Sequence, residues 1–323
     1  MIPARRFGCE PDRSPAVCER DGAGTDAMDL NNVVFEQGRY GTRAVLMGPS
    51  SNDLVDTLVA RRAVELELNS GRGWVGGSIE FVVGLPSLLA LYIRDLTLSS
   101  VSPIHELHEL RALDVGTYCR TPIDFTQFPK LEDCMLEWRR GAESVFQMSE
   151  LKRLVINRYK GHSVDALGGL RCLRELGLLN APVSTLDGLS ELEDLRRLRL
   201  VRLRKLTSLT GLASLRNLEE LEITSCPTID DIAPIGRLAQ LRRLSLNNLG
   251  RISSLRPVSR LRHLESVHFW ESTDITDGDL GVLLTLPALR SVFFRERSHY
   301  THRRSAFDQY GATLPRLPSV LDS

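Results

Sequence analysis

The sequence has few cysteines, few aromatic residues and no excess of either charge. Its 323 residues include six cysteines, and no two of them form a Cys-x-x-Cys pair. This usage excludes a disulfide framework and a zinc site of the common spacing. Lys and Arg together number 41, as do Asp and Glu, so the formal net charge is zero. Because no basic field surrounds such a chain, we expect it to bind neither nucleic acid nor an anionic membrane surface.

Long apolar runs are also missing. No stretch of 18 apolar residues occurs, and the arginine-containing N-terminus lacks the apolar core of a secretory signal. We therefore expect a soluble protein that is reduced and cytoplasmic and does not enter a membrane. Residues 1–28 are rich in Pro, Gly, Arg and Asp, which predicts a disordered N-terminal tail, and Met28 is a candidate for the true start.

Leucine is the residue that the sequence has in excess, at 54 of 323 positions. The leucines follow the pattern LxxLxL, which recurs eleven times at intervals of 20 to 25 residues. Alternate residues of a strand point to one side, so each copy predicts a short strand with two inward side chains. The four clearest copies begin at Leu173, Leu195, Leu218 and Leu241, and the seven looser copies begin at Ala63, Leu88, Leu110, Leu131, Leu151, Leu264 and Leu289.

Between these strands, apolar residues recur at every third position. This period suits short 3₁₀ turns or extended coil, and it fits neither an α-helix nor a strand. Each unit is therefore predicted to be one strand and one compact return, which can bury its leucines only against the next unit. The clearest runs are Val183-Leu186-Leu189-Leu192 and Ile229-Ile232-Ile235-Leu238.

The segment GLSELEDLRRLRLVRLRKLTSLTGLASLRNLEELEITSC resembles bacterial leucine-rich repeats of the internalin-like type, with units of about 22 residues. The resemblance extends over residues 63–297. It implies an α/β leucine-rich-repeat solenoid, shaped as a horseshoe or arc, with a parallel concave β-sheet and 3₁₀ or irregular convex returns. The best copies lack the Asn that this family usually carries in the turn, so an Asn ladder is absent and the buried turns need other hydrogen-bond partners. The residues at that position are Ala181, Leu203, Cys226 and Leu249.

Both ends of such an array expose a core face, so caps are expected there. Residues 29–62 predict an N-terminal cap, formed by two strands around a Gly-Arg-Tyr-Gly turn and a helix from about Ser51 to Arg62. Ser50 and Asp53 have the spacing of a capping box for this helix, and Leu54, Val55, Leu58 and Val59 share one of its faces. Residues 298–323 predict a short C-terminal cap and a tail that contains proline.

Three kinds of motif that could carry chemistry are better explained by the fold. They are the GxGxxG pattern of Gly71, Gly73 and Gly76; the histidine groups His105–His108 and His299–His302, the latter near Glu296 and His268; and the cysteines Cys119 and Cys134. The glycines are not followed by the helix that a dinucleotide site requires, and the first two histidines are three residues apart instead of four. Cys134 takes the second leucine position of its repeat, so we expect a buried and unreactive core residue, and Cys119 has no His or Asp partner in register. We therefore expect a non-enzyme with no catalytic residue, cofactor or metal.

The repeat register places the residues that flank the inward leucines on the concave face. In chain order, this face divides into an acidic first third, a basic middle, an acidic pair and an aromatic end. The acidic third holds Glu65, Glu67, Asp114, Asp133 and Glu137, and the basic middle holds Arg153, Arg158, Arg197, Arg199 and Arg202. Glu220 and Glu222 form the acidic pair; the aromatic end holds His268, Trp270, Phe293, Arg295 and Arg297, and Tyr92 and Trp138 lie nearer the start.

These features predict a monomer that binds a protein partner through the concave face, as a scaffold, a regulatory subunit or an immunity protein. Exposed aromatic side chains beside arginine are typical of binding hot spots. The other interpretation is that Trp270 and Phe293 pack under the C-terminal cap. An alternative function is an enzyme or sensor that binds a phosphorylated ligand in the basic middle. The residues expected to contact the partner are Tyr92, Arg153, Arg197, Arg199, Arg202, Glu220, Glu222, His268, Trp270, Phe293 and Arg295.

Overall fold

The computed structural model describes residues 32–308, so the predictions for residues 1–28, and for the tail after residue 308, lie outside the described residues. The main sheet has 13 strands, which follow one another in chain order from β1 to β11 and end with β13 and β15. The first two strands pair antiparallel, and each later pair of neighbours is parallel. A second sheet contains β12 and β14 alone.

The strands of the main sheet include all eleven predicted copies. Each copy supplies one parallel strand, from β3 to β11 and then β13 and β15. The strand bounds are β1 (Val33–Gln37), β2 (Thr42–Leu46), β3 (Ala63–Asn69), β4 (Ala90–Arg94), β5 (Ala112–Gly116), β6 (Asp133–Glu137), β7 (Arg153–Asn157), β8 (Glu175–Leu179), β9 (Arg197–Val201), β10 (Glu220–Thr224), β11 (Arg243–Asn247), β12 (Arg251–Ile252), β13 (Ser266–Phe269), β14 (Asp274–Ile275) and β15 (Ser291–Phe294).

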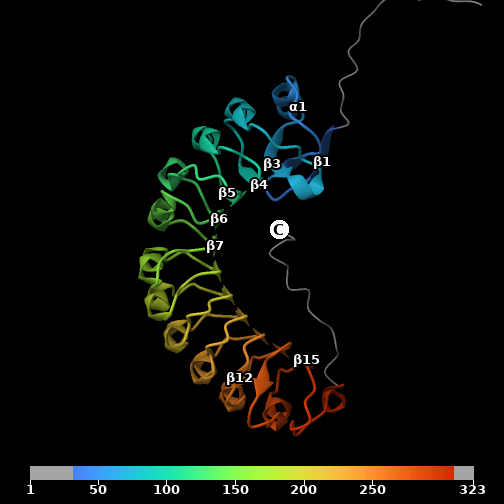
Figure 1. Cartoon of the computed structure of the whole chain (residues 1–323), viewed down its shortest axis with the longest axis vertical. Coiled ribbons are helices and arrows are strands. Elements are labelled where there is room, and N and C mark those ends of the chain that lie inside the picture. The colour runs from blue at the N-terminus through green and yellow to red at the C-terminus, as the bar shows by residue number, and fades with distance from the viewer. Residues whose placement is uncertain (1–31, 309–323) are drawn as a thin grey trace, which may run out of the picture. The chain divides into compact units, whose positions relative to one another are not determined.

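The returns between strands are 3₁₀ helices, as the period of three predicts. In Figure 1 the strands of the main sheet lie along the inner side of an arc, and most of the helices between them lie along its outer side. The helix bounds are α1 (Leu54–Ala60), η2 (Ser70–Arg72), η3 (Glu80–Gly84), η4 (Ser102–Glu106), η5 (Phe125–Gln127), η6 (Ala142–Gln147), η7 (Asp165–Gly169), η8 (Asp187–Glu191), η9 (Thr210–Ser214), η10 (Ala233–Arg237), η11 (Arg256–Arg260), η12 (Gly281–Thr285) and η13 (Arg304–Phe307).

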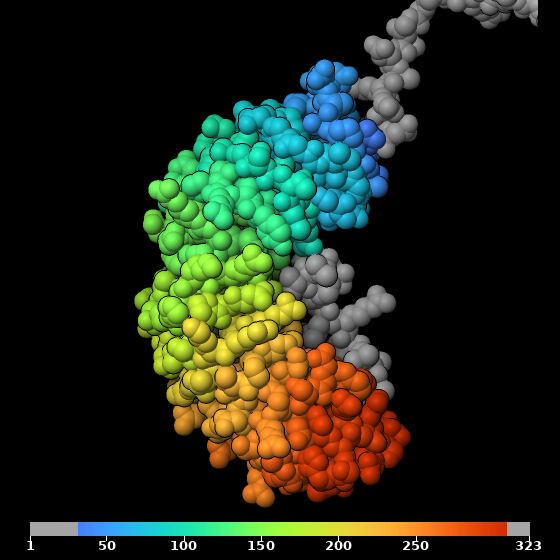
Figure 2. All heavy atoms as spheres, in the orientation of Figure 1, coloured from blue at the N-terminus to red at the C-terminus, as the bar shows by residue number. Residues whose placement is uncertain are grey.

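The leucines of both patterns meet in one continuous core between the sheet and the returns. Leu176 and Leu178 of β8 are fully buried, as are Leu186 and Leu189 of the return that follows. Burying one such side chain contributes about 1.5–3 kcal/mol. Since each unit packs on the next, the bands of colour in Figure 2 follow one another from blue to red without a break. None of the helices between residues 32 and 308 has the length and hydrophobicity needed to span a bilayer.

Many of the strands are followed by a residue in the left-handed conformation. Its backbone forms hydrogen bonds in the turn, where the family usually has an Asn ladder. The φ angles of these residues lie between 53° and 59°, and each backbone N–H donates to a carbonyl of the next repeat at 2.8–3.1 Å. Backbone hydrogen bonds between repeats thus hold the turn. The position that usually carries Asn in this family is occupied by buried apolar side chains. The residues concerned are Arg158, Asn180, Arg202, Ser225 and Asn248.

The N-terminal segment contains the expected hairpin and helix, with two corrections. The predicted capping box is wrong, because Asp53 takes the N-cap position and no side chain caps the helix. The second correction concerns the apolar face of the helix. Leu54 and Leu58 are buried as predicted, but Val59 on the same face is 60% exposed. At the other end, Phe307 of η13 packs edge-on against Phe294 at 5.7 Å between ring centroids, so it covers the core of the last repeat.

Candidate functional site

A groove of about 650 Å³ runs along the concave face of the sheet. Its lining comes from every strand of the main sheet from β3 to β13, together with Arg39 and Arg43 of the N-terminal hairpin region. The side chains that line it flank the inward leucines, because neighbouring residues of a strand point to opposite faces. The fold therefore places the outward side chains of each of these strands on this surface.

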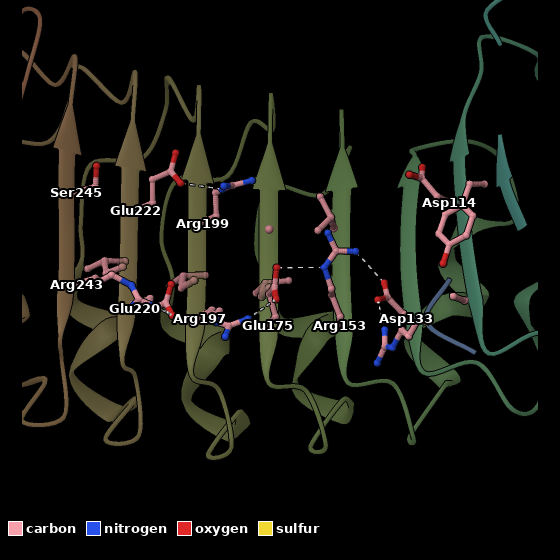
Figure 3. Close-up of a pocket in the computed structure, with 18 of the residues that line it drawn as sticks. Asp114, Asp133, Arg153, Glu175, Arg197, Arg199, Glu220, Glu222, Arg243 and Ser245 are labelled. Atoms are coloured by element: carbon pink, nitrogen blue, oxygen red, sulfur yellow. Dashed lines mark hydrogen bonds and ion pairs between the residues drawn. The ribbon is translucent and has the colours of Figure 1, made fainter. Parts of the chain in front are cut away.

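Six charged residues form a line across the groove, which we call the charge ladder. The sheet register pairs each of them with the next, one per strand from β6 to β11. Carboxylates and guanidiniums alternate along this line, as Figure 3 shows. The members of the charge ladder are Asp133, Arg153, Glu175, Arg197, Glu220 and Arg243.

Each arginine of the charge ladder is held by carboxylates of neighbouring strands. Arg153 donates from Nη1 to Asp133 at 2.8 Å and from Nε to Glu175 at 3.1 Å. Arg197 donates from Nη1 to Glu175 at 3.4 Å and from Nε to Glu220 at 3.0 Å. Arg243 also donates to Glu220. Two bonds to different strands fix the direction of a side chain that is otherwise flexible.

The charges of the ladder support one another electrostatically. Burial lowers the pKa of the Arg153 guanidinium, but Asp133 and Glu175 outweigh it and raise the pKa above its ordinary value. Burial likewise lowers the pKa of Arg197, and Glu220 and Glu175 more than offset this effect. The arginines therefore stay charged and oriented within the groove.

The predicted basic middle needs correction. Arg153 and Arg197 alternate with carboxylates, and Arg199 pairs with Glu222 at 2.8 Å, so these arginines do not form a zone of unopposed positive charge. Arg202 is exposed at the left-handed turn after β9 and does not line the groove. A phosphorylated ligand would therefore compete with carboxylates already bonded to the guanidiniums.

The sequence contained the signal for this ladder. Residues at the same register position of six successive repeats read Asp, Arg, Glu, Arg, Glu, Arg. Grouping charges by their order along the chain hides the alternation, because partners in the ladder are 20 to 23 residues apart. Reading one register position across repeats would have revealed it.

The N-terminal end of the groove is acidic but also neutralised. Glu65 is fully buried and accepts from Arg43 Nε at 3.0 Å, and the Tyr92 hydroxyl donates to it at 3.4 Å. Burial raises the pKa of Tyr92 to about 12, and the charge of Glu65 adds to the effect. Arg94 pairs with the buried Asp114 at 3.1 Å. Of the predicted contact residues, Tyr92 therefore lines the groove but is already bonded within it.

The aromatic end is partly exposed, so neither interpretation of it holds alone. Trp270 is 37% exposed and stacks on Phe293, with 4.6 Å between ring centroids. The guanidinium of Arg304, from η13, lies 4.8 Å from the centre of the Phe293 ring. Exposed Arg295 lines a second hollow of about 480 Å³ beside Trp270. The C-terminal segment thus covers part of Phe293 and leaves Trp270 accessible.

His268 is a groove residue whose neighbours the sequence did not reveal. Its Nε2 lies 3.0 Å from the hydroxyl of Ser266 and 3.4 Å from that of Ser291. Burial lowers its pKa, and no carboxylate among residues 32–308 is found to offset this effect. A serine nucleophile needs a base that is oriented by a third group. Among the described residues, no third group orients His268 beside Ser266 or Ser291. These residues therefore do not resemble a catalytic triad.

The other motifs have structural roles. His105 bonds the backbone of Ser102 and of Asp124, and burial raises the pKa of Cys134 well above its ordinary value. Trp138 is not part of the concave face as predicted, because it packs between Phe146 and Tyr159. Among the described residues, no group of three or more His, Cys, Asp or Glu could hold a metal ion.

Comparison with known proteins agrees with the repeat geometry. The profile of a family described as a leucine-rich repeat region matches residues 137–313, more than half of the chain. The chain belongs to the leucine-rich-repeat family. No curated protein matches this leucine-rich-repeat chain in sequence.

Several solved leucine-rich-repeat structures are similar in fold. An internalin of Listeria monocytogenes is 18% identical, with 84% of this chain and 85% of that chain covered at a TM-score of 0.60. A leucine-rich-repeat protein of Leptospira interrogans is 16% identical, with coverage of 81% and 79% and a TM-score of 0.50. The Arabidopsis receptor kinase HAESA, solved with a peptide hormone and a co-receptor, is 19% identical, with coverage of 73% and 42% and a TM-score of 0.54. Such identities show a shared fold alone.

Proposed function

We propose that this leucine-rich-repeat protein binds a protein partner in its concave groove and catalyses no reaction there. The groove carries the proposal, because it presents polar side chains that the core does not use, and the accessible ring of Trp270 lines a second hollow. Eleven strands about 4.8 Å apart extend on the order of 50 Å. That length accommodates the roughly 800 Å² per partner that a stable complex buries.

Two further points support a protein partner. Leucine-rich-repeat proteins are typically interaction modules, and HAESA was solved in complex with a peptide hormone and a co-receptor. The alternating charges also suit a protein surface, which carries both signs, better than they suit a polyanion. We propose a cytoplasmic monomer whose role is that of a scaffold, a regulatory subunit or an inhibitor of its partner.

Affinity capture from the native cytoplasm tests this proposal. The tagged protein should retrieve a partner, and Trp270→Ala or Arg199→Glu should weaken its capture, because Arg199 lines the groove and Trp270 lines the second hollow at the C-terminal end of the array. Arg196→Glu is the control for the charge reversal, since Arg196 pairs with Glu219 of the next repeat as Arg199 pairs with Glu222 but does not line the groove. Each variant should melt as a folded protein. Full retention of the partner by both concave-face variants would overturn the assignment.

A further inference from the structure

The arginines of the charge ladder are more accessible than most of the carboxylates that hold them. The side chain of Arg197 is 58% exposed, whereas Glu175 and Glu220 on either side are 33% and 21% exposed. Arg243 is 43% exposed and also lies above Glu220. Arg153 is 27% exposed, between Asp133 at 17% and Glu175 at 33%. Although the charges cancel in number, a partner that enters the groove over β9–β11 therefore meets guanidinium groups first. The accessible face of a neutral ladder is therefore a hydrogen-bond donor surface.

These guanidiniums keep donors for a partner. An arginine side chain has five N–H donors. The ladder bonds of Arg153 and Arg197 use Nε and Nη1, which leaves the two N–H groups of each Nη2 without a partner among residues 32–308. The carboxylates on the neighbouring strands already fix both guanidinium planes, so little side-chain entropy is lost when a partner binds. Carboxylate is the acceptor that matches such a donor fork best.

The spacing of the arginines restricts the shape of the partner. Arg153, Arg197 and Arg243 stand on alternate strands, β7, β9 and β11, in direct register. Two strand spacings amount to about 9.4–9.8 Å. A polyproline II segment rises about 3.1 Å per residue with three residues per turn, so every third side chain returns to one face after about 9.3 Å. A β-strand turns its third residue to the opposite face, and seven residues of an α-helix span about 10.5 Å.

We propose, building on the protein-binding function above, that the groove receives an extended segment of the partner with an acidic side chain at every third residue. The segment crosses the strands, and its carboxylates lie over Arg153, Arg197 and Arg243. The carboxylates of the ladder exclude a uniformly charged polyanion such as RNA, because they lie between the arginines along the same line. Alternation thus selects the spacing of the partner's charges as well as their sign.

Synthetic peptides test this inference with the full chain. A labelled peptide of five Glu-Pro-Pro repeats should bind at low salt, and the affinity should fall as salt rises. A peptide of five Glu-Pro-Pro-Pro repeats has the same charge but the wrong spacing, and it should bind at least roughly fivefold more weakly. Lys-Pro-Pro repeats and a 15-residue oligouridylate should bind more weakly still. Fluorescence anisotropy measures all four.

Matched variants locate the binding. Arg197→Gln and, on a separate rung, Arg153→Gln should each weaken binding of the Glu-Pro-Pro peptide by roughly fivefold, the value of an accessible ion pair. Arg196→Gln should change nothing, because Arg196 has the same 58% exposure and its own partner Glu219, outside the groove. Equal affinity for both glutamate spacings, tighter binding of the lysine peptide or the oligouridylate, or an equal loss in Arg196→Gln would overturn the inference.

The two proposals fail in different ways. In one case Trp270→Ala and Arg199→Glu release the captured partner, but peptide affinity depends neither on the glutamate spacing nor on Arg197. The partner then binds the concave face but is not an acidic extended segment. If the captured partner is retained by both concave-face variants, the protein-binding assignment of the groove itself is wrong.

Discussion

Asp114 shows, at the scale of single residues, how the groove couples burial to protonation. Its side chain is buried on β5, where Oδ2 pairs with Arg94 and Oδ1 has no hydrogen-bond partner among residues 32–308. Burial raises the pKa of this carboxyl to about 6, although Arg94 and Arg153 act to lower it. Asp133, on the next strand, raises it further. The ionised form of Asp114 therefore costs the folded state free energy.

The exchange Asp114→Asn should stabilise the protein in a pH-dependent way. The folded pKa of about 6 exceeds the ordinary value of 3.8, so the folded state binds the proton more tightly and wild type loses stability as pH rises from 4 to 6. At pH 7 the loss amounts to about 3 kcal/mol, at 1.36 kcal/mol per pKa unit. Urea denaturation should find the variant more stable at pH 7 and equal to wild type below pH 4. A difference that does not change with pH would contradict this account.

Sequence patterns predict inward residues far better than the contacts of outward ones. Leu176 and Leu198 had to be buried because the repeat leaves them no other place. Arg197 could be assigned to the concave face, but its partners Glu175 and Glu220 depend on which strands are neighbours and on side-chain reach. The partial cover of Phe293 by Arg304 could not be predicted, because the path of η13 follows no repeat.

At the scale of elements, the periods of the sequence predict strands and returns accurately. All eleven LxxLxL copies became strands, and the period of three became 3₁₀ helices such as η8 and η9. The sequence did not reveal the exact start of α1 or the two-residue strands β12 and β14, which pair with each other across neighbouring repeats. These have no apolar period, so only the backbone geometry of the folded chain reveals them.

Close packing between successive 3₁₀ helices predicts the effect of one glycine exchange. A methyl group on Gly211 of η9 would overlap the backbone carbonyl of Leu186, which cannot move without displacing η8. Gly211→Ala should therefore cost about 1–3 kcal/mol in the free energy of unfolding. In the control Gly169→Ala, the methyl would lie 3.6 Å from the nearest atom, an ordinary contact. The free energy of unfolding of that variant should lie within about 0.5 kcal/mol of the wild-type value or slightly above it.

Urea denaturation of the two glycine variants decides the point. The account expects a lower midpoint for Gly211→Ala alone, because only this methyl meets backbone atoms. Equal midpoints for the two variants would show that the spacing between η8 and η9 relaxes freely, and the close packing inferred between returns would be wrong.

At the scale of the whole molecule, the repeats build a long surface whose residues the fold leaves free to vary. Each strand pairs with its immediate neighbours, so the inward leucines specify the array and leave the outward residues for the binding that we propose. This division explains why the fold was predictable from the sequence and the partner was not. The charge ladder and the exposed face of Trp270 are the features from which we infer the chemistry of the partner.

Site-specific photocrosslinking tests the central claim, binding of a protein in the concave groove, most directly. A photoreactive residue replaces Ser245, which lines the groove beside the charge ladder (Figure 3), or Ser214 at the exposed end of η9 on the outer side. After irradiation in the cell of origin, the account predicts one protein adduct from position 245 and none from position 214. An adduct formed equally from both positions, or from position 214 alone, would contradict it.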